Sequence, residues 1–308
     1  MAHPKSAEAK QAAIDTNPFE DMRISDTSIL NRLDGRSPCP QCGKSRKYFC
    51  YTCYVPIAEL AGHLPKLKLP IKIDIIKHKN EIDGKSTACH AALLAPDDVT
   101  IYTYPDIPNY DEMDQVVLIF PSADARSVQQ VLNNNCKDKH EELPKGHHKG
   151  TLMKELSTNI KQNEVCTLLS NQLPVKRAVF IDSTWNQSRG IYKDDRVKRL
   201  PCVVIHNRIS QFWRHQKGSP RWYLATIEAI HQFLLEIHVS AWGVDENYKG
   251  LKNCFSDEYI CAAIRSSTND EMYNGQYDNL LYFFKHMYDL IHAYYDHEQL
   301  YAYKRRLM

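Results

Sequence analysis

The most informative segment of this 308-residue sequence reads Arg177-Ala178-Val179-Phe180-Ile181-Asp182-Ser183-Thr184-Trp185. It contains four consecutive apolar residues, from Ala178 to Ile181, which is typical of a fully buried strand in a parallel sheet. The short polar side chains that follow would lie at the C-terminal end of that strand, where open α/β sheets bind ligands. The segment therefore predicts a central strand that ends in a binding site.

The polar turn after this strand has two interpretations. Asp182 supplies a carboxylate, and Ser183 and Thr184 supply hydroxyl groups. Trp185 adds a flat surface on which a base could stack. The same residues also suit the start of a helix, because Asp, Ser and Thr cap helices and Trp often fills a core. The residues alone leave a ligand site and a helix cap equally open.

Length and composition predict one large domain with a small appendage. Hydrophobic residues make up 43% and charged residues 25% of the chain, as in ordinary globular proteins. No apolar run approaches the roughly 18 residues that a membrane span needs. The polar segment from Met1 to Asp26 lacks the apolar core of a secretory signal. We therefore expect no membrane association, and we expect the ten cysteines to be reduced or metal-bound.

Two Cys-x-x-Cys pairs with seven residues between them carry the most specific chemical signal: Cys39, Cys42, Cys50 and Cys53. Four converging thiolates make the closed tetrahedral shell of structural zinc. One redox dithiol would leave the second pair unexplained. The spacing predicts a zinc clip over residues 37–60, preceded by a flexible arm over residues 1–36.

Two basic groups are candidates for contact with nucleic acid, since a net charge of +2 is too small for the overall field to hold RNA. Basic and aromatic side chains alternate around the clip, which suits an RNA surface, with a solvated rim as the alternative. The basic residues of this group are Arg36, Lys44, Arg46 and Lys47. A second group follows the central strand and comprises Lys193, Arg196, Lys198 and Arg199.

Other apolar segments predict further strands and helices. Residues 71–75 alternate as in a half-buried strand, and a turn leads from there to a helix over residues 88–94. The continuous run from Val116 to Phe120 predicts a central parallel strand, as does the shorter run from Cys202 to Ile205. Strands that alternate with helices favour an α/β domain with a mostly parallel sheet.

The sequence also predicts two further helices and one surface insertion. Apolar residues step by four and three from Tyr223 to Ile237, which predicts an amphipathic helix. Thr226 and Glu228 lie two positions apart in it, so their side chains point in different directions. Residues 280–294 predict a terminal helix, and the charged segment at about residues 133–157 predicts a surface insertion.

Asp182-x-Thr184-Trp185 at the end of a buried strand resembles the signature of the DTW-domain family, the tRNA-uridine aminocarboxypropyltransferases. Three further segments are similar to family elements: Lys85-Ser86-Thr87, Phe120-Pro121 and Leu224–Ala229. The resemblance runs from about Ser37 to the C-terminus and is strongest to the type-1 eukaryotic branch.

The resemblance implies a catalytic domain over residues 61–308 with a C-terminal trefoil knot like that of SPOUT methyltransferases, although knots are rare and no local pattern indicates one. It implies transfer of the 3-amino-3-carboxypropyl group of S-adenosylmethionine to N3 of a tRNA uridine, in the D-loop in eukaryotic members, with release of 5′-methylthioadenosine. It suggests a nuclear location, with the cytoplasm as the alternative. No obligate protein partner is evident.

The resemblance also assigns roles to residues. Asp182 would remove the N3 proton, orient the methionine amino group or contact the sulfonium, and these roles stay open. Thr184 would hold the carboxypropyl group, and Trp185 would support an aromatic partner. Expected donor contacts are Pro121, Ser122, Ile181, Asp182, Ser183, Thr226 and Glu228. A further element, expected to bind RNA, comprises Lys85, Ser86 and Thr87. Two other functions are open: a SPOUT-like RNA methyltransferase, or a non-catalytic zinc-dependent RNA-binding protein.

Overall fold

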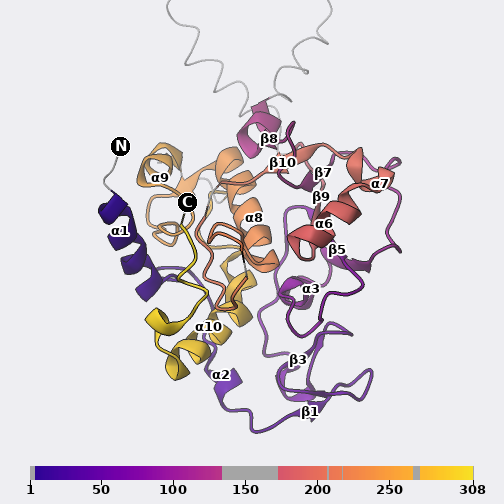
Figure 1. Ribbon diagram of the computed structural model, residues 1–308, viewed down its shortest axis with the longest axis vertical. Coiled ribbons are helices and arrows are strands. Elements are labelled where there is room, and N and C mark those ends of the chain that lie inside the picture. Colours follow the sequence, from indigo (N-terminus) through magenta and orange to yellow (C-terminus); the bar gives the residue numbers. More distant parts are fainter. Residues whose placement is uncertain (1–3, 134–172, 207, 217, 266–270, 308) are drawn as a thin grey trace, which may run out of the picture.

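A six-stranded parallel sheet forms the centre of the molecule (Figure 1). The computed structural model describes residues 4–133, 173–206, 208–216, 218–265 and 271–307. The strand order is β6-β5-β9-β7-β10-β8. The strands are β5 (Lys72–Lys77), β6 (Val99–Thr103), β7 (Val116–Ile119), β8 (Arg126–Ser127), β9 (Arg177–Asp182) and β10 (Cys202–Val204). The predicted α/β class with a parallel sheet is confirmed.

Both faces of the sheet are covered, as parallel sheets require. On β9, Ala178 and Phe180 face one hydrophobic cluster, and Val179 faces the other. The expectation that residues 71–75 form a half-buried strand is wrong, since Asp74 on β5 is fully buried. Arg177 on the neighbouring β9 donates a hydrogen bond to its carboxylate. An ion pair between adjacent strands therefore replaces the solvent-facing position that the alternation predicted.

Different helices cover the two faces. α3 (Ala88–Leu94) and α8 (Thr226–Trp242) pack on the face that includes Phe180. α6 (Trp185–Tyr192) and α7 (Asp195–Lys198) contribute apolar residues to the opposite cluster. The terminal helix is shorter than predicted, because a 3₁₀ turn, η2 (Asp278–Leu281), precedes α10 (Tyr282–Tyr294). Further elements outside the sheet in the C-terminal part of the chain are β11 (Val244–Asp245), α9 (Asp257–Ala263), β12 (Ile264–Arg265) and η3 (His297–Gln299). No helix within the described ranges has the length and hydropathy to cross a membrane.

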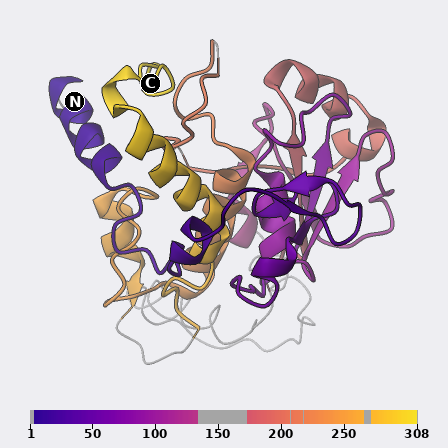
Figure 2. The ribbon, with the colours of Figure 1, turned by 90° about the horizontal axis from the view of Figure 1, so that it is seen from below.

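The N-terminal segment packs against the end of the chain, and Figure 2 shows α1 (Pro4–Thr16) alongside α10. Asp15 accepts two hydrogen bonds from the buried Arg221, at 2.6 and 2.9 Å. Phe19 is 5% exposed and makes edge contacts with the rings of Phe284 and Tyr288. Part of the segment that we expected to be a flexible arm is therefore built into the core.

The cysteine-rich segment forms two short hairpins that pack near α3 and α10. β1 (Ser37–Pro38) pairs with β2 (Ser45–Arg46), and β3 (Phe49–Cys50) pairs with β4 (Val55–Pro56). The turn η1 (Ala58–Leu60) follows, and α2 (Ser28–Asn31) precedes the hairpins. A separate hydrophobic cluster joins this region to α3 and α10. Nearly all of the expected insertion at 133–157 lies outside the described residues.

Candidate active site

A cavity of about 370 Å³ opens at the C-terminal ends of β7, β9 and β10. This volume lies within the range of small-molecule sites, and the position is where open α/β sheets bind ligands. Its wall is largely apolar and includes the large aromatic side chains of Phe120, Trp185, Trp222 and Tyr223. The predicted central strand is confirmed as β9, and it ends beside this cavity.

Trp185 lies between two other aromatic rings of the wall. Its side chain is 40% exposed, although it is large and apolar. Its ring centroid lies 4.5 Å from that of Tyr223 and 6.3 Å from that of Phe120. Phe120 in turn stacks on Tyr192 of α6 at 4.4 Å. These rings hold Trp185 in place while leaving part of its surface open for a flat ligand.

Asp182 lies at the end of β9 but does not line the cavity. Its carboxylate is almost completely buried, and each oxygen accepts a hydrogen bond. Ser86 donates to Oδ2 at 2.7 Å, and Thr226 donates to Oδ1 at 2.6 Å. Burial raises the pKa of Asp182, while the two hydroxyl donors act in the opposite direction. The carboxylate therefore joins β9 to the loop before α3 and to the start of α8.

The other expected donor contacts divide into wall residues and buried supports. Pro121, Ile181, Ser183 and Thr226 line the cavity. Ser122 does not line it, and its hydroxyl donates to Asp124 at 2.7 Å. Glu228 is fully buried. It accepts hydrogen bonds from the Ser210 hydroxyl and from the backbone N–H groups of Gln211 and Ala225.

Thr184 is the N-cap of α6, so the helix-cap interpretation of the polar turn also holds. Its hydroxyl and its backbone N–H both donate to the side-chain oxygen of Gln187, at 2.9 and 3.1 Å. The cap fixes the start of α6, and the next residue, Trp185, is thereby set against the cavity. One turn thus serves as a cap and as part of the pocket wall.

The sequence interpretation missed His206, which lines the cavity just after β10. Its Nδ1 lies 2.9 Å from Oε2 of Glu236, a fully buried residue of α8. This carboxylate raises the pKa of His206, although partial burial acts against it. The sequence did contain a signal that could have identified His206 as a site residue, because it directly follows an apolar run that forms a buried strand. Trp222 and Tyr223 were also missed as wall residues. The helix expected to begin at Tyr223 begins at Thr226, so both residues lie in the irregular segment before α8.

The Lys85-Ser86-Thr87 element divides in a similar way. Lys85 is exposed. Ser86 binds Asp182, and the hydroxyl of Thr87 accepts a hydrogen bond from the backbone N–H of Ile227 on α8. Two of the three residues therefore hold the site together from within.

The basic group that follows β9 contains two exposed lysines, Lys193 and Lys198, and the exposed Arg199. Arg199 lies 3.5 Å from the carboxylate of Asp111. Arg196 is different, because its guanidinium donates to Asp194 and to the carbonyl oxygens of Ile107 and Pro105. Arg196 therefore anchors α7 to the loop after β6.

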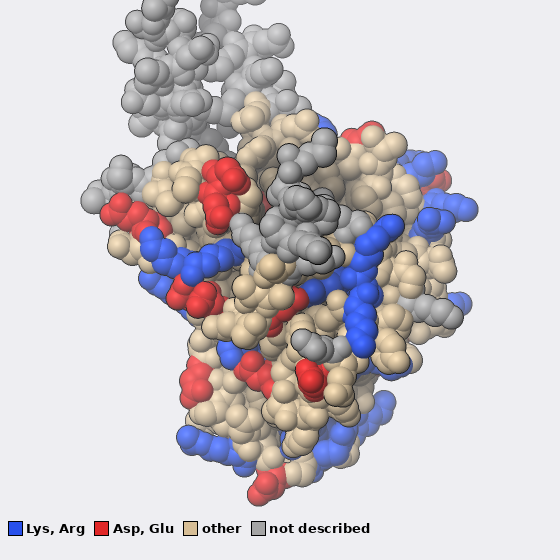
Figure 3. All heavy atoms as spheres, turned by 60° about the vertical axis from the view of Figure 1, so that its left-hand side comes forward, with Lys and Arg blue, Asp and Glu red and all other residues tan. Residues whose placement is uncertain are grey.

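The basic group around the clip also includes one internal residue. Arg36 and Lys44 are exposed, and Lys47 donates to the carbonyl oxygen of Leu33. Arg46 is buried, lies 3.9 Å over the Tyr51 ring and donates to Sγ of Cys50 at 3.4 Å. Figure 3 shows that Lys and Arg form separate groups with Asp and Glu between them on the face it presents. Such a distribution agrees with the small net charge.

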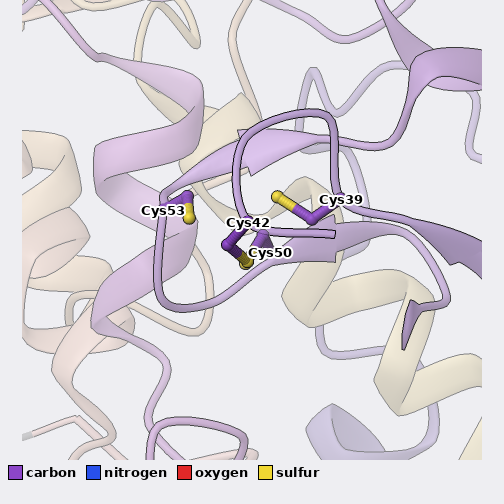
Figure 4. A group of neighbouring side chains, drawn as sticks. All are labelled: Cys39, Cys42, Cys50 and Cys53. Atoms are coloured by element: carbon purple, nitrogen blue, oxygen red, sulfur yellow. The ribbon is translucent and has the colours of Figure 1, made fainter. Parts of the chain in front are cut away.

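Figure 4 shows the four cysteine side chains of the clip turned toward one another. Their sulfur atoms all lie within 4.8 Å of one another, and those of Cys42 and Cys50 are 3.7 Å apart. Zn–S bonds of about 2.3 Å in a tetrahedron place sulfur atoms about 3.8 Å apart. Gly43, with φ +69°, allows the tight turn after the first pair. The four thiols could therefore hold one zinc ion in a closed shell.

The thiols differ in their tendency to ionise. Burial acts to raise the pKa of Cys50, but hydrogen bonds from the backbone of Thr52 and Cys53 and from Arg46 lower it to about 6. Contact with Cys42 raises the pKa of Cys53 to about 12. A metal ion bound here would have to displace protons, since zinc binds thiolates.

Comparison with known proteins identified chains of similar sequence and a matching family. Three similar proteins carry the name tRNA-uridine aminocarboxypropyltransferase 1. The Xenopus laevis protein is 36% identical, over 94% of this chain and 97% of its own length. The Mus musculus and Homo sapiens proteins are 40% and 39% identical, each over 89% of this chain and 84% of its own length. No solved structure matches the chain significantly. Residues 47–292 match the DTW domain, from the clip through α10, and the chain therefore belongs to the DTW domain family.

Proposed function

We propose that this protein transfers the 3-amino-3-carboxypropyl group of S-adenosylmethionine to N3 of a uridine in tRNA and releases 5′-methylthioadenosine. The observation that carries the proposal is the aromatic cavity at the end of β9, where the Asp182-x-Thr184-Trp185 turn forms part of the wall and its support. The names of the similar proteins support transfer of an aminocarboxypropyl group to a tRNA uridine.

The cavity suits this donor chemically. Trp185, Trp222 and Tyr223 offer flat surfaces for an adenine ring, and aromatic faces attract a sulfonium cation. Ser183 and Thr226 place hydroxyl groups on the same wall. The sulfonium already makes the attacked carbon electrophilic. The protein therefore has to align that carbon with N3 and receive the N3 proton.

Asp182 acts in this proposal as a positioning residue. Both of its oxygens already accept hydrogen bonds, one of them from the wall residue Thr226, and the wall residue Ser183 follows it directly in the chain. Its charge also adds a negative potential close to the site of the sulfonium. Thr184 caps the start of α6 and thereby supports Trp185, which lines the cavity.

Other parts of the proposal rest on family resemblance. We propose a D-loop uridine as the target, one structural zinc ion in the clip, a catalytic domain over residues 61–308 and a trefoil knot in its C-terminal half. A nuclear location is proposed on the same ground, and cell fractionation would test it. The basic end, Lys304-Arg305-Arg306, adds little support, since Arg305 is buried and donates to the carbonyl oxygens of Ala302 and Pro220.

The decisive experiment is mass spectrometry of nucleosides from tRNA incubated with purified protein and S-adenosylmethionine. We expect aminocarboxypropyl-uridine together with 5′-methylthioadenosine. A methylated nucleoside with S-adenosylhomocysteine would instead identify a methyltransferase. Unmodified tRNA that still binds the protein tightly would identify an RNA-binding protein without transferase activity.

A further inference from the structure

His206 and Glu236 form a pair at the cavity that no part of the DTW signature contains. His206 follows β10 and lines the cavity, with 39% of its side chain exposed. Glu236 comes from the middle of α8 and is fully buried. The Nδ1 atom of the imidazole lies 2.9 Å from Oε2 of the carboxylate. A cavity side chain is thus joined directly to a buried charge.

One oxygen of the buried carboxylate is held by two hydrogen bonds, and the other faces the imidazole. Its Oε1 accepts a hydrogen bond from the backbone N–H of His206 at 2.7 Å and another from the Gln232 side chain at 2.9 Å. The rings of Phe255 and Tyr259 pack edge-on against the imidazole, at 6.0 and 5.2 Å. With Nδ1 turned toward Glu236, Nε2 is the ring nitrogen left for a ligand in the cavity.

On the basis of the transfer reaction proposed above, we propose that His206 is the general base that accepts the N3 proton of the uridine, and that Glu236 positions it and stabilises its protonated form. The N3–H bond breaks as the proton passes to Nε2. N3 forms a bond to the methylene carbon next to sulfur. The carbon–sulfur bond breaks, and its electron pair stays on sulfur, which leaves as a neutral thioether. The imidazolium then releases its proton to water.

The wall composition favours His206 over Asp182 for this role. Among the described side chains that line the cavity, His206 alone titrates near neutral pH when unperturbed. Asp182 lies outside the wall, and both of its oxygens accept hydrogen bonds from hydroxyl groups. A buried carboxylate behind a histidine is the arrangement that orients an imidazole and stabilises the imidazolium in other enzymes.

The surroundings of the imidazole define its electrostatics. Glu236 on α8 is the charged group in contact with it, and Tyr259 on α9 and Phe255 are the neighbouring rings. Burial raises the pKa of Tyr259, so this phenol stays neutral. Glu236 raises the pKa of His206. The base is neutral above that pKa and protonated below it, so transfer should fail on the acid side.

The test is the pH dependence of kcat/KM for tRNA in four proteins: the wild type, His206→Gln, Glu236→Gln and the control His63→Gln. His63 is exposed and follows the clip. We expect His206→Gln to lose about 100- to 10,000-fold at neutral pH. Its rate should keep rising with pH, since the N3 proton must then leave to hydroxide. Glu236→Gln should shift the acid limb to lower pH and lower the plateau. The control should match the wild type.

Three results would overturn the inference. A His206→Gln enzyme with the wild-type pH profile would exclude His206 as the base. Wild-type activity that falls as His206 loses its proton would show that the imidazolium is the active form and binds the carboxylate of the donor. No aminocarboxypropyl-uridine from the wild type would overturn the proposed function as well. Thermal unfolding and S-adenosylmethionine affinity of each variant check its fold. If Glu236→Gln unfolds, the His206→Gln profile decides alone.

Discussion

Thr226 Oγ1 donates a 2.6 Å hydrogen bond to Oδ1 of Asp182, which joins the first residue of α8 to the last residue of β9. Ser86 donates to the other carboxylate oxygen from the loop before α3. Three segments that are far apart in the sequence thus meet at one carboxylate. The hydrogen bonds also explain how a buried Asp is tolerated, because each oxygen has a partner.

Substitution of Asp182 distinguishes a positioning role from a base. Asp182→Ala removes the acceptor that joins β9 to Ser86 and Thr226, and a shift of about 1 Å in the wall can cost about 100-fold in rate, so kcat/KM should fall by about 100-fold or more. Asp182→Asn keeps one acceptor oxygen, and a hydroxyl group of Ser86 or Thr226 can accept from its amide. We expect a loss of about tenfold for this variant. Steady-state transfer assays provide the measurement, and equal losses in both variants would indicate a base.

Removal of the clip cysteines should release one zinc ion per chain. Metal analysis of the purified wild type should give one equivalent, and Cys39→Ser/Cys42→Ser should give none, because two thiolates cannot close the shell. Cys261→Ser is the matched control, since Cys261 is an exposed free cysteine on α9. Zinc retained by the double variant would rule out the proposed ligands.

The ion pair between Asp15 and Arg221 should make a large and pH-dependent contribution to stability. Arg221 is 2% exposed, so Asp15→Asn would leave a buried charge unpaired, at a cost of about 3–5 kcal/mol in the free energy of unfolding. Burial acts to raise the pKa of Asp15, but Arg221 lowers it below 3.8 overall. The stabilisation is therefore complete above the unfolded-state pKa and is lost as pH falls through the lower folded value.

Denaturant unfolding at pH 7, 5 and 4 and below tests this pair. The difference between wild type and Asp15→Asn should be constant from pH 7 to 5 and should shrink below about pH 4. The exposed pair of Glu20 and Lys252, 3.2 Å apart, provides the control. Glu20→Gln should change stability by less than about 1 kcal/mol. A gap that persists unchanged into acid would show that the Asp15 charge is not involved.

We expect the exposed basic residues to bind tRNA and the internal ones to stabilise the fold. Lys193→Glu/Lys198→Glu should weaken tRNA binding and reduce its salt slope by about one for each of the two lysines that binds a phosphate. Arg196→Ala should lower the thermal midpoint instead, since its guanidinium is bound within the protein. Lys252→Glu serves as the binding control. Unchanged tRNA affinity in the double reversal would exclude this surface.

The sequence patterns that predicted the strands and the cysteine cluster were local. The apolar run before Asp182 and the run at Val116–Phe120 identified adjacent strands, and the Cys-x-x-Cys spacing identified a cluster whose geometry suits a metal. These signals need only neighbouring residues. Hydrophobic patterning and ligand spacing are visible without knowing which distant segments meet.

The buried charged and polar contacts that the sequence did not predict depend on distant partners. Glu228 and Glu236 lie on the largely buried helix α8, and their partners Ser210 and His206 come from the segment after β10. Arg46 has the composition of a surface residue but turns inward to Cys50. No periodicity shows such pairings, because a charged side chain is buried only where another part of the chain supplies its partner.

The packing of the N-terminal segment also bears on synthesis of the protein. Asp15 pairs with a residue that lies 206 positions later, and Phe19 contacts Phe284 and Tyr288 on α10. At about 5–20 residues per second, a ribosome needs about 10–40 seconds to make the chain between Asp15 and Arg221. The N-terminal segment therefore cannot complete its native contacts until the C-terminal part has been translated. During that interval Phe19 lacks the rings of Phe284 and Tyr288.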